Sequence, residues 1–156
     1  MAVQCHVVHP DHHRTPSGFR DLLIDILESM GGSGDHVTVV LCRDSLIRRL
    51  NREFLNRNES TDVISFDLRG DEAKKGNSRF RGFDSSNTTG EIYVNLDRAR
   101  TQARQCGITF WEELTRLSIH GLLHLFDFDD RNPADQRKMT AKQEELLQKF
   151  WRPLHW

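Results

Sequence analysis

The chain has 156 residues, of which 29% are charged and 37% apolar, and its formal net charge is −1. That length fits one domain with its own buried core, and three cysteines without a CxxC pair exclude both a disulfide framework and a cysteine zinc ribbon. The near-zero charge excludes a surface coated in positive potential, and the lack of a signal peptide or of a bilayer-length apolar run predicts a cytoplasmic protein without a membrane partner.

The first part of the chain predicts two strands and two helices. Residues 3–9 alternate in polarity, which favours a strand, and the helical spacing of apolar residues over 19–30 predicts a helix that ends in a glycine-rich turn. Residues 36–43 are β-branched and mostly apolar, which is typical of a buried strand. We expect Asp44 or Ser45 to cap a second helix. The residues expected on its inner side are Leu46, Ile47, Leu50 and Phe54.

The second part predicts two more strands and three more helices. Strands are expected at residues 62–68 and 91–96, with a long mobile loop at 69–89 between them, and a loop of that length in a small domain is often functional. Thr109 can cap a later helix, and Glu112 completes a capping box. The helices expected here are 96–105, the apolar segment that follows Thr109 and runs to Phe126, and 134–151.

Interspersed strands and helices, with helices gathered toward the C-terminal end, predict an α+β fold. We expect a single domain over residues 1–156 in which a mixed sheet of about four strands packs against helices. The chemistry is expected on the helix in the C-terminal half that carries His120 and His124.

These two histidines have the spacing of a metal site. Residues four apart on a helix share one face, so both imidazoles can reach one ion. A third ligand must come from another direction, and Asp130 can swing back from beyond the helix end through a turn at 127–129. Three protein ligands leave an open coordination position, as in catalytic zinc sites. Buried histidines satisfied by backbone carbonyls remain the alternative.

A second pair of histidines in the chain has the same spacing of four residues. His9 and His13 also lie four apart, but Pro10 stands between them and would break a helix, so we expect surface decoration there. Gly121 occupies the position of the general base in HExxH metalloproteases, which argues against a protease. A glycine inside a helix also suggests close packing, or the close approach of another backbone or of substrate.

Four segments resemble the YbeY family of endoribonucleases. HGLLHLFDFDD at 120–130 is similar to the family signature HGxLHLxGYDH, and STDVISF at 60–66 is similar to the family's (P)TDVLSF segment. LNREF at 50–54 and GEIYVN at 90–95 match neighbouring family segments in order and approximate spacing.

Three positions depart from the family pattern. Asp130 replaces the third metal-binding His; a carboxylate is a legitimate zinc ligand, but it makes the set harder and could shift the preference toward another divalent metal. Asp127 replaces a Gly, and Asp tolerates a left-handed backbone better than most residues. Leu55 replaces a functionally important Arg, and Arg57, two residues on, is the candidate for binding phosphate. Asp129 is expected to shape the turn.

The resemblance implies a metal-dependent endoribonuclease that prefers single strands and acts in small-subunit (16S) ribosomal RNA maturation and ribosome quality control. Its partners would be RNA, the small ribosomal subunit, and ribosomal proteins or assembly factors. One divalent ion per chain, with Zn²⁺ favoured, would be held by His120, His124 and Asp130 and would polarise the scissile phosphate, activate a water, or both. Two alternatives stay open: a non-catalytic, metal-binding ribosome-assembly factor, and a metal-dependent hydrolase of another substrate class.

Basic residues gather in the second expected helix and in the loop at 69–89. Such a patch could bind RNA, although a solvated helix face explains the helical arginines equally well. The residues are Arg43, Arg48, Arg49, Arg52, Arg57, Lys74, Lys75 and Arg79.

Overall fold

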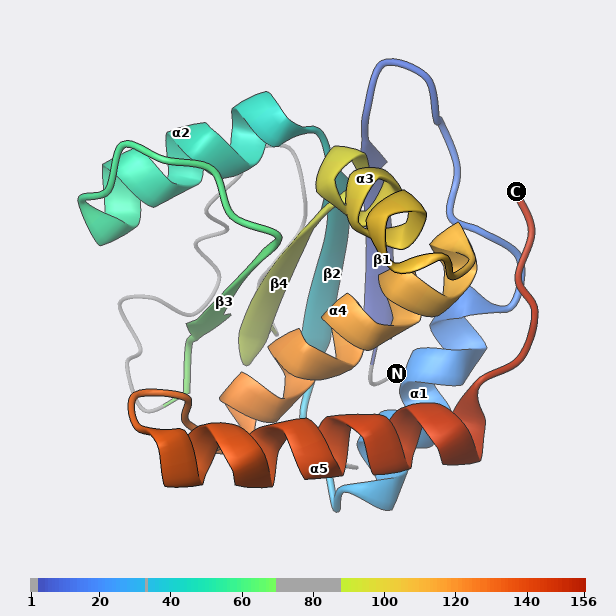
Figure 1. Cartoon of the computed structure of the whole chain (residues 1–156), viewed down its shortest axis with the longest axis vertical. Coiled ribbons are helices and arrows are strands. Elements are labelled where there is room, and N and C mark those ends of the chain that lie inside the picture. Colours follow the sequence, from blue (N-terminus) through green and yellow to red (C-terminus); the bar gives the residue numbers. More distant parts are fainter. Residues whose placement is uncertain (1–2, 33, 70–87) are drawn as a thin grey trace.

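The computed structural model describes residues 3–32, 34–69 and 88–156. These residues form four strands and five helices, in the α+β arrangement that the sequence predicts (Figure 1). The observed ends lie close to the expected ones. In chain order the elements are β1 (Val3–Val8), α1 (Phe19–Ser29), β2 (Val37–Cys42), α2 (Asp44–Leu55), β3 (Val63–Asp67), β4 (Gly90–Asn95), α3 (Leu96–Cys106), α4 (Phe110–Leu125) and α5 (Pro133–Phe150).

The sheet is mixed, with the strand order β1-β2-β4-β3. β1 pairs with β2 and β2 with β4 in parallel, whereas β3 pairs with β4 in antiparallel orientation. The central strands β2 and β4 are buried along their whole length. This explains why β2 is almost continuously apolar, whereas β4 also buries the polar side chains of Glu91 and Asn95. The prediction of one domain with a mixed four-stranded sheet is confirmed.

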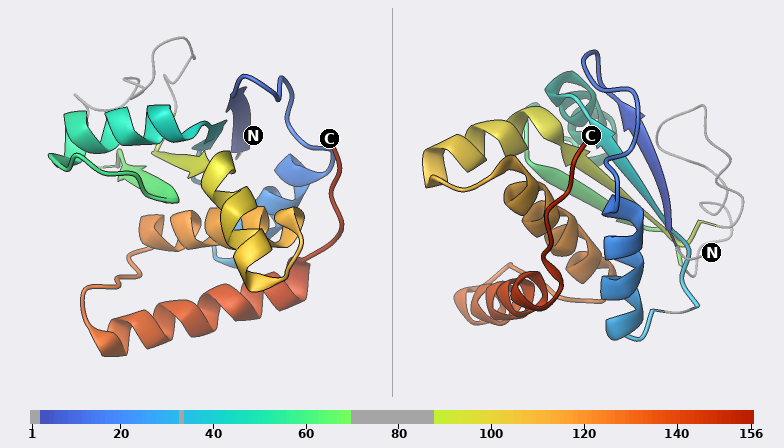
Figure 2. Two further views of the ribbon diagram at one scale, coloured as in Figure 1. Left: turned by 45° about the horizontal axis from the view of Figure 1, so that its top comes forward. Right: turned by 90° about the vertical axis from the view of Figure 1, so that its right-hand side faces the viewer.

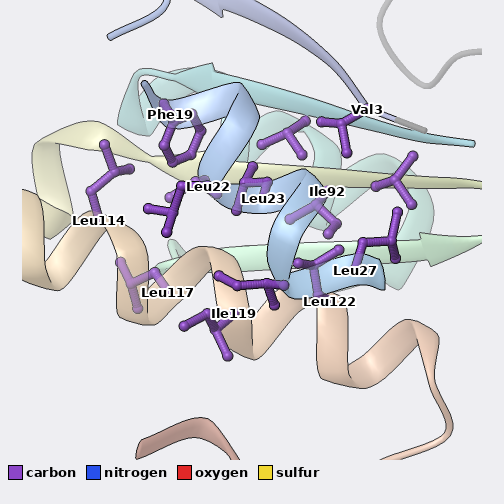
Figure 3. Close-up of a cluster of buried hydrophobic side chains, with 14 of the residues drawn as sticks. Val3, Phe19, Leu22, Leu23, Leu27, Ile92, Leu114, Leu117, Ile119 and Leu122 are labelled. Atoms are coloured by element: carbon purple, nitrogen blue, oxygen red, sulfur yellow. The ribbon is translucent and has the colours of Figure 1, made fainter. Parts of the chain in front are cut away.

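Helices cover both faces of this sheet. α1, α4 and α5 share one hydrophobic core with β1, β2 and β4, and α2 packs on the opposite face. α5 lies on the outer side of α4, away from the sheet (Figure 2), so α4 is held between the sheet and α5. Figure 3 shows apolar residues that α1 and α4 contribute to this core: Phe19, Leu22, Leu23, Leu27, Leu114, Leu117, Ile119 and Leu122.

The expected cap of α2 is wrong. Neither Asp44 nor Ser45 caps the helix, because Arg43 is the N-cap residue and its side chain makes no capping hydrogen bond. The capping carboxylate comes instead from α3, since Asp97 Oδ2 accepts a hydrogen bond from the Asp44 backbone N–H at 2.9 Å. Tertiary packing thus supplies the acceptor that a local pattern assigned to the helix itself.

Two further expectations about side chains are also wrong. Phe54 was expected to face inward, but it is 42% exposed and stands edge-on to Phe66, because the sheet ends at the edge strand β3. His9 is not surface decoration: its side chain is 6% exposed, and its Nε2 lies 2.7 Å from Oδ1 of Asp97. His13 is exposed, as expected. His9 therefore ties the end of β1 to the start of α3.

The expected mobile loop at 69–89 lies mostly outside the described residues, which omit 70–87. Both of its described ends are held. Arg69 pairs with Asp67 and donates a hydrogen bond to the Leu125 carbonyl at the end of α4. The Thr89 backbone N–H donates to the carbonyl of His36 at 2.7 Å.

Candidate metal centre and adjoining groove

Two histidines project from α4 toward the same point. Thr109 caps the helix as predicted, because its hydroxyl accepts a hydrogen bond from the Glu112 backbone N–H at 3.1 Å. Helical spacing then places His120 and His124 on one face, and their Nε2 atoms lie 3.2 Å apart. Both side chains are about 30% exposed, so they are accessible to an ion and yet withdrawn from bulk water.

Gly121 lets α4 lie directly on the sheet. A Cβ atom at this position would lie 2.6 Å from Cγ2 of Ile92 and 3.1 Å from Cγ2 of Val63. The carbonyl of Gly121 accepts a hydrogen bond from the Ser65 hydroxyl at 2.9 Å. The prediction of close packing at this glycine is confirmed, and the contact sets the distance of the two histidines from β3 and β4.

A tight turn after α4 returns the chain toward the histidines. The Phe128 backbone N–H donates to the Leu123 carbonyl at 3.1 Å, and Asp127 has a φ of 66°. Asp127 therefore occupies the left-handed position of a Schellman motif, where Gly is usual and Asp is tolerated. Asp129 shapes the rest of the turn as expected, because its Oδ1 accepts from the backbone N–H of Asp130 at 2.7 Å.

The turn brings the carboxylate of Asp130 to the two imidazoles. Its Oδ2 lies 3.7 Å from Nε2 of His124 and 4.0 Å from Nε2 of His120. Ligand atoms that share a tetrahedral ion at about 2.1 Å lie roughly 3.4 Å apart. The three side chains are therefore close to coordination spacing and could hold one metal ion.

The hydrogen bond of His120 with α5 leaves the nitrogen that faces His124 as an acceptor. Nδ1 of His120 lies 2.7 Å from Oε1 of Gln143 on α5, and since a carbonyl oxygen only accepts, Nδ1 carries the hydrogen. The His124 imidazole is hydrogen-bonded to the backbone of Phe128. In the neutral ring of His120, the lone pair of Nε2 then faces Nε2 of His124 across 3.2 Å, and a cation between the two nitrogens would be bound by this lone pair.

The electrostatics of the site favour the form of histidine that binds metals. Burial lowers the pKa of His124, and the neighbouring His120 lowers it further, against the opposing effect of Asp130. A lowered pKa keeps the imidazole neutral, and the neutral imidazole is the ligand. Two imidazoles and one carboxylate also form the donor set of many zinc hydrolases, so the residues present fit a divalent ion.

α5 supports the site in a way that the sequence did not reveal. Besides Gln143, Gln136 donates from Nε2 to the backbone carbonyl of Asp130 at 2.8 Å. The helix is positioned by Asn132, whose Oδ1 accepts from the Asp135 backbone N–H. Sequence reasoning missed both glutamines, because their contacts depend on how α5 crosses α4 and no local pattern encodes that crossing.

A groove of about 690 Å³ opens beside His124 and Asp130. It extends along β3 to the turn that follows α2, and Arg57, the candidate phosphate-binding residue, lines its far part. Leu55, which replaces the Arg of the family pattern, lines the same groove. The lining residues are Asn51, Leu55, Arg57, Glu59, Ser60, Thr61, Val63, Ile64, Ser65, His124 and Asp130.

The other arginines of α2 belong to a solvated helix face. Arg48 pairs with Asp44 at 3.5 Å, and Arg49 pairs with Glu53 at 3.8 Å, both within the helix and both largely exposed. Exposed ion pairs of this kind contribute little to stability, and they offset part of the positive charge of these two arginines. The lysines and the arginine expected in the loop, Lys74, Lys75 and Arg79, lie outside the described residues.

Comparison with known proteins agrees with this geometry. The family model described as "Endoribonuclease YbeY" matches residues 9–151. An endoribonuclease YbeY of Salinibacter ruber is 34% identical over 139 residues, which cover 89% of this chain and 85% of that protein. One of Geobacillus thermodenitrificans is 36% identical over 117 residues, which cover 75% of this chain and 74% of the relative.

A solved structure has the same fold. The solution structure of TM1509 from Thermotoga maritima superimposes with a TM-score of 0.59 and 25% sequence identity, and the match covers 95% of this chain and 89% of that one. The family model and the match to the Salinibacter protein both include the segment that carries the two histidines and Asp130. The chain therefore belongs to the YbeY endoribonuclease family.

Proposed function

We propose that this protein is a metal-dependent endoribonuclease that cuts single-stranded RNA in the maturation of small-subunit (16S) ribosomal RNA and in ribosome quality control. Membership of the YbeY family supports the reaction class. The observation that carries the metal dependence is the convergence of two imidazole Nε2 atoms and one carboxylate at the end of a groove.

His120, His124 and Asp130 would hold one divalent cation, with Zn²⁺ preferred. Gln143 fixes the ring of His120 so that Nε2 faces the ion, and the turn through Asp127 delivers the carboxylate. When bound, the cation supplies Lewis acidity to a phosphate oxygen and to the attacking nucleophile. Arg57 neutralises phosphate charge farther along the groove.

The shape of the groove favours a single strand. It is open to solvent, and its walls carry hydroxyl, amide and aliphatic side chains together with Arg57 and the carboxylates of Glu59 and Asp130. Single-stranded RNA can turn its bases toward such side chains while a phosphate of its backbone approaches Arg57, which a stacked duplex cannot do.

The protein would act in the cytoplasm on the small ribosomal subunit, in company with ribosomal proteins or assembly factors. Among the helices of the described residues, none combines the length and apolar character that crossing a bilayer requires. The net charge of −1 is consistent with binding through a local site instead of through a generally basic surface.

Metal content and cleavage should be measured on the same preparations. Protein purified without chelators is expected to contain about one metal ion per chain and to cut a single-stranded RNA, and chelation should abolish the cutting. His124→Ala should lose both the metal and the activity. His13→Ala, which removes an exposed histidine outside the site, should lose neither.

Three outcomes would count against the proposal. If the purified wild type contains no metal, the proposal of metal dependence fails. Cleavage that persists in His124→Ala points to a contaminating nuclease. A protein that binds metal and sediments with the small subunit but cuts no RNA is the non-catalytic assembly factor. Cleavage of unfolded casein or another substrate in place of RNA would identify a hydrolase of a different class.

A further inference from the structure

Leu55 is an exposed apolar residue in the groove. It is the last residue of α2 and is 46% exposed, whereas most leucines in the described residues are buried. It lines the groove together with Val63 and Ile64 of β3. An aliphatic side chain left open to water beside a polar site is suited to contact with a flat apolar surface.

The turn that follows Leu55 is held rigidly. Asn56 adopts the left-handed conformation with φ 56°, which ends α2 and sends the chain back toward β3 (Figure 1). Asn51, which is 3% exposed, clamps the turn at two points. Its backbone carbonyl accepts from the Arg57 N–H at 3.1 Å, and its side-chain Nδ2 donates to the Glu59 carbonyl at 2.9 Å.

Arg57 and Glu59 are thereby presented at the groove with their charged groups available. The closest approach of the guanidinium to the carboxylate is 4.0 Å, and the side chains are 72% and 65% exposed. An ion pair of this geometry is weak and a ligand can replace it. The groove thus offers an apolar contact, a cation and an acceptor-only carboxylate within one short segment.

We infer that this segment forms a nucleobase subsite in which Leu55 contacts the face of a base and Glu59 accepts a hydrogen bond from an exocyclic amino group. The inference rests on the proposed function. Adenine, cytosine and guanine carry amino groups, whereas uracil presents a carbonyl oxygen that the carboxylate repels. Arg57 neutralises the phosphate of the same nucleotide, so the subsite prefers amino-bearing bases over uracil.

The test uses cytidine and uridine hexamers, which are matched in size and differ at this edge of the base. Binding to the zinc-loaded wild type is followed by fluorescence anisotropy. The same measurement on His120→Ala, which is expected not to cut RNA, gives the binding without cleavage. The cytidine hexamer is expected to bind about tenfold more tightly than the uridine hexamer. Glu59→Gln should abolish this preference, because an amide also donates to the uracil oxygen.

Three variants separate the parts of the subsite. Glu53→Gln removes a neighbouring carboxylate of α2 that does not line the groove, and it should keep the preference. Leu55→Ser should lower the affinity for both hexamers by a similar factor of roughly five to ten. Leu55→Phe should raise the affinity for both, because a phenyl ring stacks on a base.

Equal affinity for the two hexamers in the wild type overturns the inference, as does a preference that survives Glu59→Gln. The absence of measurable binding to either hexamer also overturns it. These results are distinguishable from failure of the proposed function, because that failure is a protein that binds no metal or cuts no RNA, whatever its base preference.

Discussion

Gln143 of α5 holds His120 of α4 through a hydrogen bond of 2.7 Å between Oε1 and Nδ1. The bond fixes both the ring orientation and the nitrogen that carries the hydrogen. Nε2 is therefore left free on the side of His124 and Asp130. The outermost helix thus prepares a donor atom of a site that α4 and its C-terminal turn otherwise form by themselves.

Loss of this bond is expected to weaken metal binding. In Gln143→Leu the ring of His120 can rotate or place its hydrogen on Nε2, so the affinity for Zn²⁺ should fall by about 10–100-fold. Competition with a chromophoric chelator measures this directly. Gln148→Leu replaces an exposed glutamine of the same helix and should keep the wild-type affinity, and Gln143→Glu, which retains an acceptor, should restore most of it. An unchanged affinity in Gln143→Leu would show that the bond does not orient the ligand.

Asp130 is expected to influence which metal binds. A carboxylate is a harder ligand than imidazole, so Asp130→His should raise the affinity for Zn²⁺ relative to Mn²⁺ on the order of tenfold. Asp130→Ala should lower the affinity for both metals. Titration of each apo protein with the two ions gives the ratio. If Asp130→His leaves the ratio unchanged, the carboxylate is not part of the coordination sphere.

Local sequence patterns predicted the parts of this molecule that depend on nearby residues. Periodicity, composition and turn signals placed the strands and helices of the described residues, and a spacing of four residues with a turn was sufficient to bring His120, His124 and Asp130 together. What the patterns missed arises from packing between distant segments. The Asp97 carboxylate caps α2 from α3, and Gln143 reaches His120 across 23 positions of sequence. No periodicity or capping rule carries such information.

The left-handed backbone of Asp127 predicts a measurable strain. With φ at 66°, Asp127→Ala should lower the free energy of unfolding by about 1 kcal/mol, whereas Asp127→Gly should leave it unchanged or raise it slightly. Urea denaturation of both variants measures the difference. Equal stability of the alanine and glycine variants would indicate that the turn relaxes to an ordinary conformation.

Gly121→Ala tests the contact between α4 and the sheet. Helix propensity alone favours alanine by about 1 kcal/mol. Because the new Cβ would lie 2.6 Å from Cγ2 of Ile92, we expect a net destabilisation of about 1–3 kcal/mol and a weaker affinity for metal as the helix shifts. Gly34→Ala is the control, since nothing lies within 4 Å of a Cβ at that position. A stabilised Gly121→Ala would mean that the helix can move away without loss.

The hydrogen bonds of Asp44 predict how the free energy of unfolding changes with pH. A hydrogen bond from the Ser60 hydroxyl, and another from the Asn95 amide, hold the pKa of its carboxyl below the ordinary value of 3.8. A folded-state pKa below the unfolded one means that the ionised carboxylate stabilises the fold above that ordinary value, and that this contribution is lost as the pH falls through the lowered folded value. The wild type should therefore lose stability between about pH 5 and pH 3 more steeply than Asp44→Asn, which is expected to be the less stable of the two near pH 7. Urea denaturation across this range measures both slopes, with Asp25→Asn as a control that removes one aspartate charge outside this network. Parallel slopes in the wild type and Asp44→Asn would show that the Ser60 and Asn95 hydrogen bonds do not favour the ionised form of Asp44.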